Sequence, residues 1–539
     1  LAGADLAGAY LAGADLKYAN LEYASLVDAT LKYVDLTDAN LMYADLTGAN
    51  MYEVNLTDAY LSNADLTDVN LAHANLKCTE LKHADLSGAD LEAADLSCAK
   101  LMYADLTDAY LYQASLTSAD LSYADLTDAT LDGASLTGDA ELTYADLTGA
   151  SLNYANLTGA DLQYATLTDA NLYYAYLTDA YLAYADLTGA DLEYADLTGA
   201  DLSNNGWAPA NLTDANLEGA DLTHADLAYA DLTDAYLEEA DLTDANLEGA
   251  DLTGETVLAF ADLKDANLEY ANLTGAILYK ADLTDANLRD AVLTNAILDY
   301  ADLTDANLEG ADLTGADLAH ADLRTAGLEG ANLTEARLLG ADLTGANLEN
   351  AVLKDAMLVD TDLRGAYLEN ADLTGAVLVW ATLIDAVLTY ADLTGVDLQY
   401  ANLQAARLNY TNLSGANLEY ASLVDANLKY ANLENAYLER ADLRGAYLEY
   451  VDLTDANLEG ANLKDANLEY ADLTDAYLKD ADLTRANLYE ADLTDANLKD
   501  TDLKWADFDD ATVTGADFDG SYWYQTTWTD GERYDSNQS

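Results

Sequence analysis

The sequence is poor in the residues that mark several common classes of protein. It has one Pro, three Phe and two Cys in 539 residues, and two Cys cannot form the disulfide framework of a small secreted domain. No apolar run approaches the roughly 18 residues of a membrane-spanning helix, so we expect no membrane insertion. No phosphate-binding loop, metal-ligand spacing or pairing of a nucleophile with a base occurs. The sequence therefore predicts no enzymatic activity, no catalytic residue and no cofactor.

Basic residues are also scarce. Lys and Arg number 22 against 99 Asp and Glu, which gives a formal net charge of −77. A surface of this charge repels phosphate groups, which argues against direct binding of nucleic acid. Salt relieves such repulsion, so the composition suits an extracellular or cell-surface protein and equally the cytoplasm of a salt-adapted organism. Apolar residues make up 51% of the chain and recur at fixed positions, unlike those of a disordered acidic tail.

A five-residue pattern fills nearly all of the chain. It reads Ala, then Asp or Asn, then Leu and two variable residues, as in Ala145-Asp146-Leu147-Thr148-Gly149. The central Leu, or a residue in its place, recurs 104 times from Leu1 to Phe518. A period of five fits neither the helical turn of about 3.6 residues nor the alternation of a strand. A coil with one short side per repeat satisfies it, because each Leu and the Ala two residues earlier then point inward.

This pattern resembles that of the pentapeptide-repeat family, A(D/N)LXX, from residue 1 to about residue 520. The resemblance implies an all-β fold, a right-handed quadrilateral β-helix (β-solenoid) with four repeats per coil, hence about 26 coils. Some members of that family are similar to duplex DNA in width and charge and bind DNA gyrase. The resemblance therefore allows two functions, a structural protein or a DNA mimic.

We expect a continuous solenoid over residues 1–520, with irregularities near 137–141, 203–209 and 255–260. One extra residue lies around Gly138-Asp139, and another around Leu258-Ala259-Phe260, after a centre at Val257. Glu255 then takes an inward site, where an unpaired carboxylate is costly, so that coil should open locally. Residues 203–209 keep the five-residue frame, with Trp207 as a centre.

Tyr residues alternate with Thr-Gly and Thr-Asp pairs before residues 203–209, and the alternation slips by one repeat there. If four repeats per coil hold throughout, the Tyr residues must move to the adjacent sides of the coil at this point, a rotation of a quarter turn. The later Tyr ladder then lies on a side adjacent to the one bearing Tyr144, Tyr164 and Tyr184. The alternative is that residues 203–209 loop out and leave the Tyr sides aligned.

The two ends differ in composition. The pattern fails from Ser521, and we interpret residues 521–539 as an aromatic-rich cap or tail, because solenoids need their open edges covered. The candidate cap residues are Tyr522, Trp523, Tyr524, Trp528 and Tyr534. The chain begins at Leu1, within a repeat and without Met. We expect the first coil to be continued by upstream residues or covered by another copy.

Several outward side chains are candidates for contacts. We interpret the four His residues (His73, His83, His224 and His320) as incidental surface residues. Cys78 and Cys98 lie one coil apart. We interpret them as structural or incidental residues, and the alternative is a metal-binding or redox pair. Columns of Asp and Asn form a solvated acidic face, or bind Ca²⁺ or similar cations weakly. A ladder at spacing twenty either staples neighbouring coils or contacts a partner: Tyr390, Tyr410, Tyr430, Tyr450 and Tyr470.

The sequence thus favours a non-enzymatic, acidic, rigid rod that serves as a spacer, stalk, fibre element or protein-interaction scaffold. Its partners would be another protein or further copies of itself, end to end or side by side. The alternative is a DNA-mimicking protein that targets a DNA-binding enzyme such as DNA gyrase.

Overall fold

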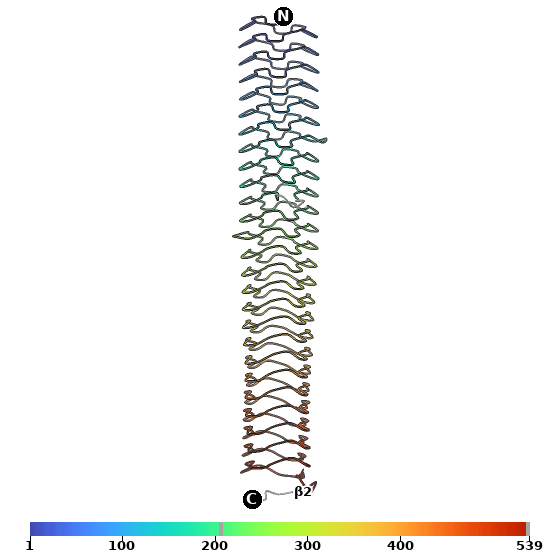
Figure 1. Cartoon of the computed structure of the whole chain (residues 1–539), viewed down its shortest axis with the longest axis vertical. Helices are drawn as coiled ribbons and strands as arrows, with labels where there is room; N and C mark the ends of the chain where they lie inside the picture. The colour runs from blue at the N-terminus through green and yellow to red at the C-terminus, as the bar shows by residue number, and fades with distance from the viewer. Residues whose placement is uncertain (204–208, 535–539) are drawn as a thin grey trace. The chain divides into compact units, whose positions relative to one another are not determined.

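The computed structural model describes residues 1–203 and 209–534. The chain divides into two compact units, Leu1–Asn272 and Leu273–Ser539. In each unit short coils of chain stack upon one another (Figure 1). No helix occurs in the described residues, and almost all pairing is through parallel bridges of single residues. The two named strands, β1 (Thr526–Thr527) and β2 (Arg533–Tyr534), form a small antiparallel hairpin.

The bridges repeat every twenty residues, so four repeats make one coil. Asp5 pairs with Ser25, and Ser25 pairs with Asp45. The amide of Ser25 donates to the carbonyl of Ala4 at 2.9 Å, and its carbonyl accepts from Leu6 at 2.7 Å, both in the preceding coil. The flanking Ala24 carbonyl and Leu26 amide bond to Asp45 of the following coil at 2.9 and 2.6 Å. Every side therefore satisfies its backbone polar groups against the coils above and below, as buried backbone requires.

A tight turn joins each side to the next. The carbonyl of Leu26 accepts a hydrogen bond from the amide of Ala29 at 3.0 Å, which closes the turn over Val27 and Asp28. The second turn residue has a positive φ, 54° at Asp28 and 62° at Tyr390. This left-handed conformation costs a residue other than Gly about 1–2 kcal/mol. The stacked coils must supply that energy at most of the corners.

The core is a double column of Leu and small residues. From Leu21 onward the central Leu side chains are almost fully buried, and the Ala residues two positions earlier are equally shielded. Close packing leaves no room for a larger side chain beside each Leu. Thr361 occupies one of the Ala positions, and its hydroxyl donates to the carbonyl of Leu338 at 2.8 Å. The hydroxyl group is tolerated inside because a backbone carbonyl of the previous coil accepts its hydrogen bond.

The first irregularity adds one residue to a turn. Asp120 pairs with Glu141, a spacing of 21, and the three residues Thr137 to Asp139 replace the usual two-residue turn. Gly138 and Asp139 both have positive φ. The spacing returns to twenty at Glu141 and Asp161, so the coil above and the coil below keep their register.

The quarter-turn prediction for residues 203–209 is wrong within the first unit. Asp201 pairs with Asp226, a spacing of 25, and the spacing returns to twenty between Asn211 and Asp231. Five residues are therefore added between two neighbouring sides, and Leu202 donates its amide to Asp226 of the following coil at 2.7 Å. The sides stay aligned, as in the looped-out alternative. Trp207, which the sequence makes a centre, lies outside the described residues.

The prediction that Glu255 points inward after a shift at residues 258–260 is also wrong. Glu255 is exposed, and its amide donates to Asp234 Oδ1 at 2.7 Å. Thr256 takes the inward site instead, fully buried, with its hydroxyl donating to the carbonyls of Leu232 and Thr253. The extra residue thus lies in the turn before Thr256, and Leu258 is the central residue. A neutral hydroxyl that finds carbonyl acceptors is far cheaper to bury than a carboxylate.

Candidate interaction surfaces

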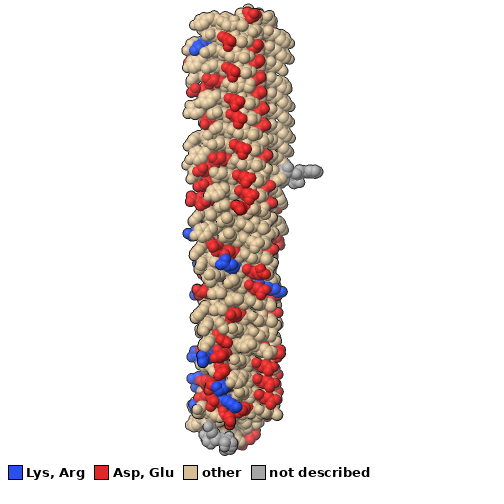
Figure 2. Space-filling view, turned by 90° about the vertical axis from the view of Figure 1, so that its left-hand side faces the viewer, with Lys and Arg blue, Asp and Glu red and all other residues tan. Residues whose placement is uncertain are grey.

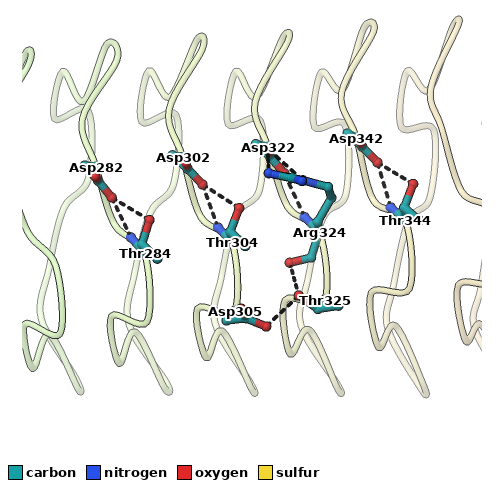
Figure 3. Close-up of polar contacts among 10 residues, drawn as sticks. All are labelled: Asp282, Thr284, Asp302, Thr304, Asp305, Asp322, Arg324, Thr325, Asp342 and Thr344. Carbon is teal, nitrogen blue, oxygen red and sulfur yellow. Dashed lines mark hydrogen bonds and ion pairs between the residues drawn. The ribbon is translucent and has the colours of Figure 1, made fainter.

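Columns of Asp and Thr run along the outward sides of the coils. In Figure 3, Asp282 and Thr284 are joined by two hydrogen bonds, from the Thr amide and the Thr hydroxyl to Asp Oδ1, at 3.0 and 2.6 Å. The same pair recurs one coil later at Asp302 and Thr304. Each Asp side chain thereby holds the backbone at the start of the turn, because Asp commonly accepts a hydrogen bond from the backbone amide two residues later. The carboxylates therefore stabilise the turns and also contribute to the acidic surface.

Arg324 replaces Thr in this column and forms an ion pair with Asp322 within the same repeat (Figure 3). Its Nε donates to Asp322 Oδ1 and Oδ2 at 2.7 and 2.8 Å. Partial burial opposes ionisation of Asp322, but the hydrogen bonds and charge of Arg324 outweigh it and lower the pKa of this carboxyl below its usual range. Exposed pairs of this kind add little stability, so we regard them as local charge compensation.

The acidic charge is distributed unevenly along the chain. Figure 2 shows Asp and Glu in rows along one face, with few Lys and Arg among them. Residues 101–263 contain 31 Asp and Glu and not one Lys or Arg. The second unit holds most of the basic residues, and several pair across consecutive coils, such as Lys354 with Asp372 at 3.0 Å. The first unit therefore carries the least compensated charge.

The predicted Tyr ladder is present as a continuous stack of rings in the second unit. Successive ring centroids from Tyr390 to Tyr470 lie 4.7–5.0 Å apart, with interplanar angles of 3–15°. The five side chains are 37–60% exposed. Offset stacking at this distance stabilises neighbouring coils. Their role as a contact surface stays a prediction.

A second stack lies in the first unit, and sequence reasoning had named only part of it. Its rings are nearly parallel, with centroids 4.6–5.0 Å apart. The stack comprises His83, Tyr103, Tyr123, Tyr144, Tyr164 and Tyr184. His320 likewise stacks on Tyr300 at 4.8 Å. These two His residues are therefore not incidental, and the signal was their spacing of twenty from a Tyr at the same turn position.

Cys78 and Cys98 form a disulfide between consecutive coils, with Cα atoms 4.5 Å apart. Both occupy the second turn position, with φ values of 52° and 55°. Side chains at consecutive corners run parallel, and the sequence alone left open whether they could meet. The bond makes this pair a structural staple of the first unit.

The candidate cap residues do not act as one group. Trp523 and Trp528 pack against each other with centroids 4.9 Å apart and against buried Phe508. Phe518 joins the same cluster, although the sequence counted it among the repeats.

The remaining candidates, Tyr522, Tyr524 and Tyr534, lie outside this cluster. Tyr522 and Tyr524 are exposed, and the hydroxyl of Tyr534 faces Asp530 Oδ2 at 3.5 Å. Coil pairing also continues beyond residue 520, since Asp502 pairs with Tyr522 and Asp507 with Thr527. The backbone thus keeps the coil after the Leu pattern has stopped.

Neither metal-ligand clusters nor membrane-spanning helices occur in the described residues. No group of three or more His, Cys, Asp or Glu side chains comes together in an arrangement that could hold a metal ion. Over the same residues, no helix has the length and apolar character needed to cross a bilayer. Weak cation binding along the carboxylate columns stays a prediction.

Comparison with protein families identifies the fold. The model of pentapeptide repeats matches residues 1–138, 140–204, 215–254, 256–324, 326–460 and 461–522. The chain therefore belongs to the pentapeptide repeat family, whose members form right-handed quadrilateral β-helices. No match is found among curated proteins.

Solved structures of the family are similar over parts of the chain. HetL, a pentapeptide repeat protein involved in heterocyst differentiation regulation in the cyanobacterium Nostoc sp. strain PCC 7120, is 36% identical over 38% of this chain and 91% of its own, with a TM-score of 0.27. A family member from the thylakoid lumen of Arabidopsis thaliana is 32% identical over 27% of this chain and 69% of its own, with a TM-score of 0.09. QnrB1, a plasmid-mediated fluoroquinolone resistance protein, is 17% identical over 39% of this chain and 84% of its own, with a TM-score of 0.18.

Proposed function

We propose that this chain is a non-enzymatic, acidic scaffold whose stiff units present repeated side chains to a protein partner or to further copies of itself. The observation that carries this proposal is the unbroken backbone pairing within each unit. Each side of each coil bonds to the coils before and after it: Ser25 bonds to Ala4 and Leu6 of the preceding coil, and its neighbours Ala24 and Leu26 bond to Asp45 of the following coil. Bending such a unit would break several of these bonds at once, together with the Leu contacts beneath them, so the outward columns keep fixed spacings.

Electron microscopy of the purified protein tests the stiffness, and sedimentation velocity tests self-association. We expect segments of constant width that do not fold back on themselves, in monomers or in end-to-end or lateral assemblies. Compact round particles or freely flexible chains would contradict the proposal. Measurements at low and high salt separate lateral association, which charge repulsion opposes, from the intrinsic shape.

A second function, mimicry of DNA, is favoured by the charge of residues 101–263. These residues form about eight coils, or about 38 Å at a strand spacing of about 4.8 Å. Their 31 carboxylates then give about 0.8 charges per Å, compared with one charge per about 1.7 Å of duplex DNA. A basic groove that accepts DNA would meet a comparable field here.

A DNA gyrase supercoiling assay decides between the two functions. The DNA mimic predicts inhibition that weakens steeply as salt is raised, because the attraction is electrostatic. A matched variant with Lys at four exposed Asp positions of residues 101–263 should inhibit less. Absence of inhibition at micromolar protein would remove gyrase as the target and leave the scaffold proposal standing.

A further inference from the structure

The Tyr ladder of the second unit places reactive side chains next to one another in an unusual way. Tyr410, Tyr430 and Tyr450 sit on successive coils, with centroids 4.9 Å apart and interplanar angles of 3° and 7°. Their backbones are held by the coil ladder, since the amides of Tyr410 and Tyr430 donate to Lys429 and Glu449 of the next coils at 3.0 and 3.1 Å. The rings themselves are about half exposed. Each phenol is therefore open to solvent and fixed beside an identical phenol.

A covalent bond between side chains at these positions is compatible with the fold. Cys78 and Cys98 occupy the same turn position on consecutive coils of the first unit, also with positive φ, and they are joined. Tyr side chains are longer than Cys side chains, and their tips reach beyond the coil surface, so they need less backbone movement to converge. Groups held together in this way react as if at very high concentration.

We propose that this ladder is a site of oxidative cross-linking, at which a haem peroxidase with hydrogen peroxide joins neighbouring Tyr residues as dityrosine. Two phenols each lose one electron and the hydroxyl proton. The two phenoxyl radicals then form a carbon–carbon bond between the ring positions next to the oxygens. The hydrogens displaced from these carbons move to the oxygens and restore both phenols. The two electrons and two protons removed reduce one hydrogen peroxide to two waters.

The chain contains an internal comparison for this chemistry. Tyr367 is 51% exposed, as accessible as the ladder residues. Its neighbours on the adjoining coils are Asn347 and Val387, so no phenol lies beside it. Access of the oxidant is thus equal, whereas the partner for intrachain coupling is present only in the ladder. Coupling set by exposure alone would not distinguish the two.

The test treats the dilute full-length protein with peroxidase and hydrogen peroxide and maps the cross-links by tryptic digestion and mass spectrometry. Lys and Arg residues separate Tyr430, Tyr450 and Tyr470 into different peptides, so their links appear as joined peptides that have lost two hydrogens. We expect Tyr430–Tyr450 and Tyr450–Tyr470 links within one chain, and no intrachain link at Tyr367. Absence of the ladder links, or equal intrachain linking of Tyr367, would overturn the proposal.

A matched variant separates the chemistry from the packing. Tyr410→Phe with Tyr450→Phe keeps all five rings but leaves the remaining Tyr residues two coils apart. We expect links among the five positions to fall at least tenfold, while the melting temperature stays within a few degrees of that of the unmodified protein. Links between Tyr430 and Tyr470 at the original yield would contradict a mechanism based on adjacent phenols. Cross-links that rise with protein concentration would show coupling between chains and also overturn it.

Discussion

Asp299 lies beside Asp317 of the following coil, and one carboxyl oxygen of Asp299 is buried without a hydrogen-bond partner in the described structure. Burial raises the pKa of Asp299 above its ordinary value of 3.8, and the charge of Asp317 and a hydrogen bond between the two groups raise it further. Arg337 binds only the other member directly, its Nη1 lying 2.5 Å from Asp317 Oδ2, and its charge offsets the raised pKa of Asp299 only in part. Two carboxyl groups thus compete for one guanidinium.

Asp299→Asn should therefore stabilise the second unit at neutral pH by about 1 kcal/mol. Because the folded state holds the proton of Asp299 more tightly than the unfolded state, stability falls as pH rises from the ordinary pKa through the raised one. The variant should lack this fall, as measured by thermal melts from pH 3 to pH 7. Asp360→Asn, which removes an exposed charge on the same side, is the control. Equal effects of both substitutions would mean that only net charge matters.

The core predicts a sharp dependence on side-chain volume. Leu308 is fully buried, and Leu308→Ala should lower the free energy of unfolding by about 2–5 kcal/mol, because the coil cannot collapse into the cavity. Leu308→Met should cost less than about 1.5 kcal/mol, since Met51 fills an equivalent site completely. Denaturant titration measures both. Comparable losses for the two variants would show that the core does not select by volume.

The positive φ of the second turn position predicts that replacing a residue there by Gly stabilises the fold. Glu335 is exposed with a φ of 59°, so Glu335→Gly should relieve the left-handed strain and stabilise the second unit by about 0.5–1 kcal/mol after the entropic cost of Gly. Glu335→Ala removes the same charge but keeps the strain. The gain should appear only in the Gly variant, in melts at fixed salt. A gain in both would assign it to charge.

The disulfide predicts a local loss on reduction. Cys78→Ser with Cys98→Ser opens a loop of about twenty residues and should destabilise the surrounding coils by up to about 3 kcal/mol. Hydrogen exchange should show the loss in the coils near residues 78–98 and little change in the second unit, because repeat stability is local. Reduction of the unmodified protein should reproduce the effect. A uniform loss over the whole chain would contradict local coupling.

The net charge of −77 predicts stabilisation by salt. Screening weakens repulsion between carboxylates on successive coils, so the melting temperature should rise from 10 mM to 1 M NaCl at fixed pH. Calcium chloride at matched ionic strength tests the weaker expectation of cation binding, which would add a further rise. A midpoint that is flat or falls with NaCl would show that the repulsion is already compensated.

The sequence by itself determined the repeat, the inward positions of Leu and Ala and the ladder of Tyr390 to Tyr470. Each follows from a strict period of five, because side chains spaced by four repeats must stack when every side is equal in length. The family resemblance supplied the four-sided coil.

Tertiary structure decided the places where the period permits more than one alignment. The extra residue can be placed either before Thr256 or at residues 258–260 without disturbing the five-residue pattern elsewhere. Thr256 rather than Glu255 points inward because burying a carboxylate costs more than burying a hydroxyl. Five added residues before Asn211 leave the frame unchanged, so only backbone pairing reveals the spacing of 25. Tyr522 and Thr527 pair with the last coils without the Leu pattern, because backbone hydrogen bonds hold a coil whatever side chains it carries.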